Sequence, residues 1–352
     1  MEFLIQDSDC RNRVRSILKR EEHKKLVIML IDAWQKSFFN ETSMPFLAKL
    51  SSLGNAKIFE ANVQPPTVTM PRIKALTAGI VPSFIDVLFN FASVAVTEDN
   101  LIDRMKAAGK RLVFCGDDTW LRLFPGRFNS HSVGVVSFYV SDYTEVDDNV
   151  TRCAVKQLIP RNIGEWDVMV LHYLGLDHIG HSLGGTHGQI VIKLAEMDRM
   201  VKKIYSDLNN FYGDNFLIVV LGDHGMTGLG GHGGSSFSET HVPLAFVDGT
   251  PVAEKVDLVP TLSFLNHVAI PQGSLGVSLI GSIMHDGASK NFITLLSLGM
   301  NTLHFVNHSN VDAGSSYLGE GRVTKGIKVK KRWSGQPMIG LYLDLTALQR
   351  KL

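Results

Sequence analysis

The sequence predicts an α/β fold, a sandwich whose central sheet is mostly parallel and is flanked by helices. Two observations predict it: strand-length apolar runs recur along the chain, and helical patterns lie between them. Parallel neighbours need a crossover connection, which is usually a helix, so this order favours a parallel sheet over an antiparallel one.

The expected strands are short runs rich in Val, Ile and Leu. Runs that are apolar on both faces are typical of strands covered by helices on both sides. The expected strands are residues 26–31, 112–115, 168–173, 216–221 and 243–247.

Two helices are expected between these runs. In residues 190–208, apolar side chains recur at three- and four-residue spacing, which predicts a crossover helix of about five turns with one apolar stripe. A second helix is expected to begin after Asp99 as its N-cap and to end at Gly109, directly before the next apolar run.

The chain has 352 residues, of which 45% are hydrophobic and 20% charged, so it can bury a sizeable core. No repeat or linker divides the first 285 residues. We therefore expect an N-terminal extension over 1–25, one catalytic domain over 26–285 and a C-terminal tail over 286–352. The formal net charge of +1 argues against nucleic acid as an obligate partner.

Cysteine usage and sequence signals bear on the compartment. Three cysteines, an odd number without a CxxC spacing, indicate neither a disulfide framework nor a thiolate metal site. The first 24 residues mix charged and apolar side chains too densely for a signal peptide or a membrane helix. N-glycosylation sequons would suit a luminal chain. They begin at Asn40, Asn149 and Asn307.

Acidic and imidazole side chains follow four of the apolar runs. In open α/β sheets, ligands bind at the carboxyl ends of the strands. One carboxylate in such a place often only caps a helix or forms an ion pair. Acids or imidazoles after four runs favour a ligand site instead. These residues are Asp32, Asp117, Asp118, Asp177, Asp223 and His224.

The spacing of these residues predicts a metal site. Asp177 and His181 are four residues apart, so one helical turn aims both side chains at one point, whereas a glycine-flanked turn presents Asp223 and His224. His232, in a glycine-rich loop, completes the set, although a lone histidine more often has a surface or core role. Six such ligands without thiolate suit two ions, with zinc favoured and manganese as the alternative.

Two metals about 4 Å apart can hold the attacking and the leaving oxygen of a phosphoryl transfer. Such a reaction also needs a nucleophile. Thr67 and Thr69 lie just before Pro71, at the expected start of a helix that runs to Gly79. A phosphate is stabilised at a helix N-terminus, and metal contact lowers the pKa of a hydroxyl. The alternative is that both threonines only cap the helix.

Several motifs together resemble one known family. IDAW, PPTVTMPRIKALTAG, GDDTWLRLFP, HYLGLDHIGHS and GDHGM are similar to motifs of the GPI ethanolamine phosphate transferases, which belong to the alkaline phosphatase superfamily. The resemblance covers about residues 26–280 and is strongest to the paralogue that acts on the second mannose. It implies an alkaline-phosphatase-like sandwich at the luminal face of the endoplasmic reticulum membrane.

The resemblance also implies an activity: transfer of phosphoethanolamine from phosphatidylethanolamine to a mannose of the GPI-anchor precursor, with a membrane partner subunit. Thr69 would be the nucleophile that carries the phosphoethanolamine. Arg72 would contact the phosphate, and Asp118 and Trp120 would shape the donor pocket. One metal would be held by Asp32, Thr69, Asp223 and His224, and the other by Asp177, His181 and His232.

The chain departs from the family pattern in three places. Trp34, Gln35 and Ser37 replace a basic and an acidic position near the site, the loop after His181 is short, and the family's membrane anchor and transmembrane helices are not found in this sequence. Two alternatives therefore stay open. One is a metal-dependent phosphodiesterase or phosphatase, with water as acceptor, and the other is a catalytically silent truncated isoform that acts as a binding fragment.

Overall fold

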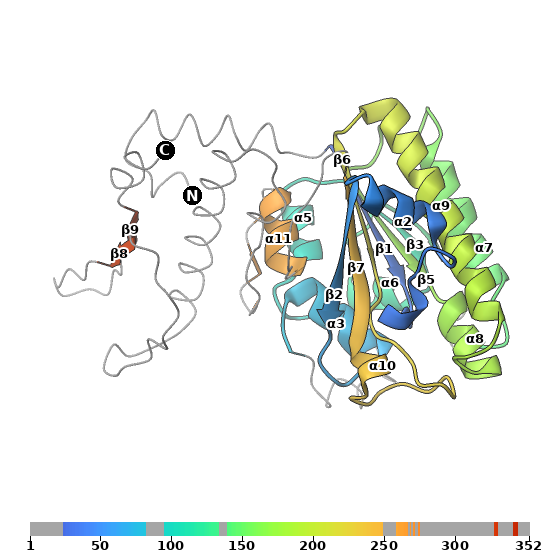
Figure 1. Ribbon diagram of the computed structural model, residues 1–352. Helices are drawn as coiled ribbons and strands as arrows, with labels where there is room; N and C mark the ends of the chain where they lie inside the picture. Colours follow the sequence, from blue (N-terminus) through green and yellow to red (C-terminus); the bar gives the residue numbers. More distant parts are fainter. Residues whose placement is uncertain are drawn as a thin grey trace, which may run out of the picture.

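The computed structural model describes residues 24–81, 95–133, 139–248 and 258–266, a few positions up to 274, and two short segments at 327–329 and 341–343. Its centre is a seven-stranded sheet with strand order β2-β7-β6-β1-β5-β3-β4, and helices cover both of its faces (Figure 1). The predicted α/β sandwich with a mostly parallel sheet is confirmed.

Every predicted run forms a strand of this sheet. The two remaining strands, β2 and β4, lie at the edges, and the partly exposed β2 lacks the continuous apolar character that made the central strands recognisable. The strands are β1 (Lys25–Ile31), β2 (Ala56–Asn62), β3 (Leu112–Gly116), β4 (Ser130–Val133), β5 (Val168–Tyr173), β6 (Phe216–Leu221) and β7 (His241–Asp248).

The long crossover helix is confirmed as α9 between β5 and β6, but one predicted cap was wrong. The helix before β3 is capped by Asn100, whose side chain accepts the Asp103 N–H at 2.9 Å, while Asp99 forms an ion pair with Arg104. The helices are η2 (Lys36–Phe38), α2 (Pro45–Ser52), α3 (Thr69–Ala78), α5 (Leu101–Ala107), α6 (Thr119–Leu123), α7 (Glu145–Leu158), α8 (Gly175–Leu183), α9 (Gln189–Tyr212), α10 (Phe237–Thr240) and α11 (Leu258–Leu265).

Two hydrophobic cores lie on opposite faces of the sheet. Alternate residues of β1, such as Val27 and Met29, pack with α2, α7, α8 and α9. The residues between them, such as Leu26 and Ile28, pack with α3, α5, α6 and α11. Because both faces are covered (Figure 1), the strand is apolar throughout residues 26–31, which is the pattern that the sequence displayed.

The run at 243–247 was expected in a parallel sheet, yet β7 is antiparallel to both of its neighbours. The connection from β6 contains only the four-residue helix α10 and no crossover helix, so the chain turns back at the same edge of the sheet. As a result, the whole loop between β6 and β7 lies at the carboxyl edge of the parallel strands.

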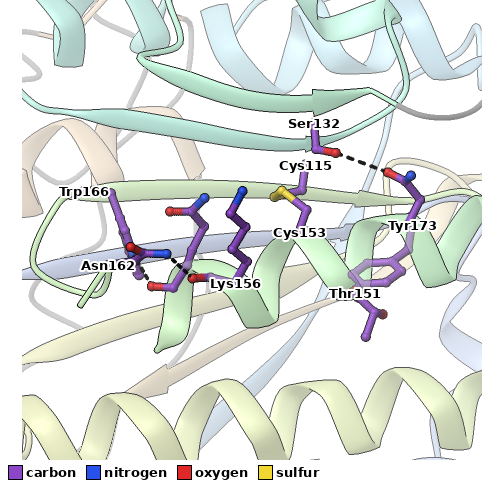
Figure 2. Close-up of a disulfide and its surroundings, with 10 residues drawn as sticks. Cys115, Ser132, Thr151, Cys153, Lys156, Asn162, Trp166 and Tyr173 are labelled. Atoms are coloured by element: carbon purple, nitrogen blue, oxygen red, sulfur yellow. Dashed lines mark hydrogen bonds between the residues drawn. A yellow bond between two sulfur atoms is a disulfide. The ribbon is translucent and has the colours of Figure 1, made fainter. Parts of the chain in front are cut away.

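A disulfide joins Cys115 of β3 to Cys153 of α7 (Figure 2). The cysteine count had indicated no disulfide, and that prediction was wrong for this pair. The two residues are 38 positions apart and meet because α7 packs over β3, which cysteine counting alone does not reveal. Structural disulfides persist mainly in oxidising compartments.

The domain boundaries stay predictions. The first 23 residues and the boundary at residue 285 lie outside the described residues, as does the sequon at Asn307. Within the predicted tail, β8 (Ile327–Val329) and β9 (Leu341–Leu343) pair in antiparallel fashion. None of the helices in the described part of the chain combines the length and the apolar character needed to cross a bilayer.

Candidate metal centre

Neighbouring strands bring the predicted ligands together at the carboxyl edge of the sheet. The pairing of β1 with β6 is parallel and ends with Leu30 opposite Leu221, so Asp32 and Asp223 follow at the same edge. The Ala33 N–H donates to Asp223 Oδ1 at 3.2 Å. Ala33 has a φ of 58°, a left-handed backbone conformation that is uncommon for residues other than glycine.

Asp32, Asp223 and His224 form what we call the strand-end group. One donor atom from each lies within 4.8 Å of the others, and all three residues are buried. His224 Nε2 is 3.4 Å from Asp32 Oδ1 and 3.5 Å from Asp223 Oδ2. Neither of these two oxygens has a hydrogen-bond partner among the described residues.

Asp177, His181 and His232 form a second set, the helix-loop group. The predicted i, i+4 pair lies on α8, with Asp177 Oδ2 3.4 Å from His181 Nε2. His232 reaches over from the glycine-rich loop: its Nε2 is 3.4 Å from Asp177 Oδ1 and 3.0 Å from His181 Nε2. The rings of His232 and His224 stack with centroids 4.1 Å apart, so the two groups adjoin.

Main-chain carbonyls fix the tautomers of two imidazoles. His224 Nδ1 donates to the Gly225 carbonyl at 3.0 Å and His232 Nδ1 donates to the Thr67 carbonyl at 2.8 Å. Since a carbonyl only accepts, each Nδ1 carries the hydrogen and each Nε2 keeps a lone pair directed at the centre. Burial lowers the pKa of His181, His224 and His232, which favours their neutral forms.

The pKa values of the three carboxylates are shifted in different directions. Burial, followed by the charge of Asp32, raises the pKa of Asp223 to about 7. Burial, with the charges of Asp32 and Asp223, raises the pKa of Asp177 well above its usual value. Burial opposes ionisation of Asp32 too, but the hydrogen bond from His172 and the nearby imidazoles bring its pKa below the usual range. Burial and mutual repulsion thus disfavour the ionised forms of Asp177 and Asp223. A cation bound between these carboxylates would offset both effects.

The donor sets fit divalent cations. Atoms bound about 2.0–2.1 Å from a tetrahedral zinc lie roughly 3.4 Å from one another. The contacts within the two groups, 3.0–3.5 Å, are close to this spacing. Within the described residues, three buried carboxylate oxygens of the two groups lack hydrogen-bond partners, and each lies 3.4–3.5 Å from an imidazole Nε2. They are Asp32 Oδ1, Asp177 Oδ1 and Asp223 Oδ2.

The two candidate nucleophiles have different surroundings. Thr69 begins α3, and its Oγ1 donates to Asp32 Oδ2 at 3.2 Å and lies 3.5 Å from His224 Nε2. The Thr67 hydroxyl is buried and donates to the Gly234 carbonyl at 2.8 Å. Neither threonine caps α3 through its side chain, because the N-cap position belongs to Val68. Only Thr69 faces the strand-end group.

The residues predicted to bind substrate come from two helices and have different surroundings. Arg72 lies one turn after Thr69 on α3, buried, and its Nε donates to the Asp223 carbonyl at 3.1 Å. Asp118 occupies the N-cap position of α6 and pairs with Arg122. Trp120 lies in the hydrophobic core, not at the surface of the site.

Sequence reasoning missed His172. It lies inside β5, with Nε2 3.2 Å from Asp32 Oδ2 and Nδ1 3.3 Å from Asp117 Oδ1. Trp120 Nε1 is 3.2 Å from the same Nδ1. Burial opposes the charged form, yet the two carboxylates raise the pKa of His172 to about 10. The available signal was a histidine in the middle of a fully buried strand, VMVLHY.

Asp147 of α7 was also missed, although it supports the helix-loop group. Its Oδ1 accepts the N–H groups of Leu174 and Gly175, at 3.1 and 2.9 Å, and so fixes the start of α8. Lys193 of α9 lies 2.9 Å from Asp147 Oδ2, and both side chains are buried. This ion pair joins three helices behind the two ligands on α8.

The glycine-rich loop is shaped by close packing. A Cβ atom on Gly230 would collide with the Gly180 carbonyl of α8, and one on Gly225 would collide with the Ser238 carbonyl. The Gly230 φ of 82° also favours glycine. The loop therefore lies directly on the helix that carries Asp177, which brings His232 into range.

Comparison with known proteins identifies the family. Residues 95–239 match the family model of the type I phosphodiesterases / nucleotide pyrophosphatases. The human GPI ethanolamine phosphate transferase 2, catalytic subunit, is 38% identical over 338 residues, which cover 91% of this chain and 33% of that protein. The chain belongs to the GPI ethanolamine phosphate transferase family. This places it in the alkaline phosphatase superfamily, as its motifs suggested.

The human GPI ethanolamine phosphate transferase 3, catalytic subunit, is 42% identical over 282 residues, or 72% of this chain and 25% of that protein. Two paralogues of the transferase family thus match at similar identity, and the match does not select one mannose. Among solved structures, a 2-O GAG sulfatase aligns with a TM-score of 0.54 at 15% identity, over 74% of each chain, which shows a shared fold.

The chain spans about a third of the length of the human transferase 2 that it matches. Family membership and the two groups of donor residues both indicate that this region binds divalent metal.

Proposed function

We propose that this domain transfers phosphoethanolamine from phosphatidylethanolamine to a mannose of a GPI-anchor precursor, with the second mannose as the favoured acceptor. The observation that carries the proposal is the position of Thr69. Its hydroxyl lies at the N-terminus of α3 and touches both Asp32 and His224 of the strand-end group. Family membership supplies the substrate class.

The reaction has two displacements at one phosphorus atom. First, the Thr69 oxygen bonds to phosphorus, the bond from phosphorus to the diacylglycerol oxygen breaks, and diacylglycerol leaves with the proton that the threonine hydroxyl gave up. Then the mannose hydroxyl attacks the same phosphorus, the bond to Thr69 breaks, and the proton of the mannose hydroxyl returns to Thr69. The phosphothreonine-type intermediate carries the ethanolamine between the two steps.

We propose two divalent ions as cofactors, with zinc favoured over manganese because the donors are imidazoles and carboxylates. When bound, such ions lower the pKa of a contacting hydroxyl and neutralise phosphate charge. His172 and the Ala33 N–H hold Asp32 and Asp223 in place. One ion would be held by Asp32, Thr69, Asp223 and His224, and the other by Asp177, His181 and His232.

The donor phosphate has further partners in the proposal. Thr69 lies at the N-terminus of α3, where backbone N–H groups without a helical partner suit an anion. Arg72 is one turn away on the same helix and supplies positive charge there. Asp118, at the start of α6, is proposed to contact the ethanolamine amine, and Trp120 would act indirectly, through His172.

We place the domain at the luminal face of the endoplasmic reticulum membrane, with a membrane partner subunit. Three features support an oxidising, luminal environment. One is the Cys115–Cys153 disulfide. The other two are sequons: Asn40 lies in an exposed loop, where its Oδ1 accepts the Thr42 N–H at 2.9 Å, and Asn149 lies on α7.

The test is to incubate the purified chain with zinc and with phosphatidylethanolamine that is labelled in its ethanolamine. The incubation is done with and without the GPI glycolipid. We expect label on Thr69 without acceptor and label on the glycolipid with it. Release of free phosphoethanolamine in both cases would instead support a phosphodiesterase or phosphatase, a reading that the matched family model favours. A chain that binds no metal and takes up no label would be the catalytically silent fragment.

A further inference from the structure

Thr67 is not needed as a nucleophile, yet its hydroxyl and its main-chain carbonyl are both hydrogen-bonded. Its Oγ1 accepts the Gly233 N–H at 2.8 Å and donates to the Gly234 carbonyl at 2.8 Å. Its main-chain carbonyl accepts His232 Nδ1–H at 2.8 Å. One buried residue therefore contacts three consecutive residues of the glycine-rich loop.

Glu239 holds the same loop from its other end. Its Oε1 accepts the Gly234 N–H at 2.7 Å and lies 3.5 Å from Thr67 Oγ1. Its Oε2 accepts the Ser236 N–H at 3.2 Å, within a capping box at the start of α10. Residues 232–239 are thus held on two sides, and the Thr67 hydroxyl binds the two residues that directly follow His232.

Loop geometry alone does not hold His232 in place. Gly233, directly after it, has a φ of 118°. Glycine adopts many other backbone conformations about as readily, so this residue does not by itself fix the position of the loop. The Nε2 of His232 must nevertheless stay 3.4 Å from Asp177 Oδ1 for the two residues to share one ion. Without the hydroxyl, the Gly233 N–H and the Gly234 carbonyl would lose their partner and the loop would gain alternative positions.

We propose that Thr67 is a positioning residue whose hydroxyl clasps the His232 loop and so completes the helix-loop group. Thr67 is two residues before Thr69, so the same short segment presents the nucleophile to one group and holds a ligand of the other. This role rests on the proposed function of the centre. It explains why the motif has two threonines, two residues apart, of which only one faces the strand-end group.

The test is a zinc titration of the purified full chain with Thr67→Val, which keeps the shape and removes the hydroxyl, and with Thr67→Ser, which keeps the hydroxyl. We expect Thr67→Val to weaken one of two zinc equivalents about 10- to 100-fold, the usual effect of losing a supporting partner, and to leave the other unchanged. Thr67→Ser should restore the weakened equivalent. Two strong equivalents in Thr67→Val would overturn the proposal.

Thr77→Val is the matched control, because Thr77 is another buried threonine, on α3, whose hydroxyl donates to the Ile73 carbonyl at 2.8 Å and not to the loop. It should bind zinc as the unaltered chain does. If Thr67→Val does not fold by circular dichroism, Glu239→Gln loosens the same loop and should selectively weaken the same equivalent. Loss of both equivalents together in the folded variant would mean a general structural role and would also overturn the proposal.

Labelled donor separates this inference from the proposed function. If Thr67 were itself the nucleophile, Thr67→Val would lose the covalent label while binding zinc normally, and the positioning role would be wrong. If the unaltered chain binds two zinc ions but never takes up label, the proposed function fails, and the zinc titration still decides the role of Thr67.

Discussion

The strand-end group and the helix-loop group have the same donor chemistry but different foundations. The side chains of Asp32 and His224 are fully buried, whereas those of His181 and His232 are 34% and 12% exposed. The first group grows out of two paired strands. The second is assembled from one helix and one loop that other side chains hold in place.

The two groups therefore differ in how firmly their ligands are held in place. The strand-end group inherits its geometry from the hydrogen-bonded register of β1 and β6, which the two hydrophobic cores stabilise. The helix-loop group depends on single side chains, Asp147 behind α8 and Thr67 under the loop. We expect the strand-end ion to be the more tightly held and the helix-loop ion to exchange more readily.

The largest effect should come from Thr69→Ala. Because the nucleophile is lost, label transfer should fall roughly a thousandfold or more. Zinc content by elemental analysis should stay at two equivalents, since the three other donors of the strand-end group are intact. Thr69→Ser should keep measurable transfer. If Thr69→Ala retained most of its activity, Thr67 or water would be the attacking group.

His181→Ala should affect the helix-loop group and leave the strand-end group unchanged. We expect loss of one zinc equivalent with little change in melting temperature, because this side chain is partly exposed. His224→Ala, in contrast, should remove the other equivalent and also lower the melting temperature, because it leaves a buried cavity. Equal effects of the two variants on stability would contradict the proposed difference between the groups.

Reduction of the disulfide should affect the helix-loop group first. Opening a closed loop of 38 residues is expected to cost about 3–4 kcal/mol of unfolding free energy, which denaturation with and without reductant measures. The disulfide tethers α7, which carries the Asp147 cap of α8, so zinc at the helix-loop group should be released at lower denaturant concentration. The double variant Cys115→Ser with Cys153→Ser should respond like the reduced chain.

The smallest effect concerns acid. Burial opposes ionisation of Glu239, but hydrogen bonds from Ser236 and Gly234 bring its pKa below the usual value. A lowered pKa means that its stabilisation is present above the ordinary pKa of a glutamate and is lost as the pH falls below it. We expect His232 to leave the group in this acidic range, visible as a shift of its NMR signals. Glu239→Gln should abolish that acid-dependent step, and an unchanged step would assign it to another group.

Much of the fold was predictable because burial on both faces leaves a mostly apolar run in each central strand. The helical stripe of α9 was equally clear. The direction of β7 was not, since it depends on the connection and not on the strand itself. The N-cap of α5 was misassigned by one residue because Asp99 and Asn100 are both good caps, and only the geometry chooses between them.

The sequence by itself determined the chemistry available to this protein: which strands end in acids, which helix pairs a carboxylate with an imidazole, and which threonines precede a helix. Tertiary structure alone decided how those pieces are used. The packing of α7 over β3 made the disulfide, parallel register placed His172 against Asp32, and the return of β7 left His232 above α8. The reason is physical: residue type and local spacing are written along the chain, whereas contacts between distant segments exist only once the sheet has paired.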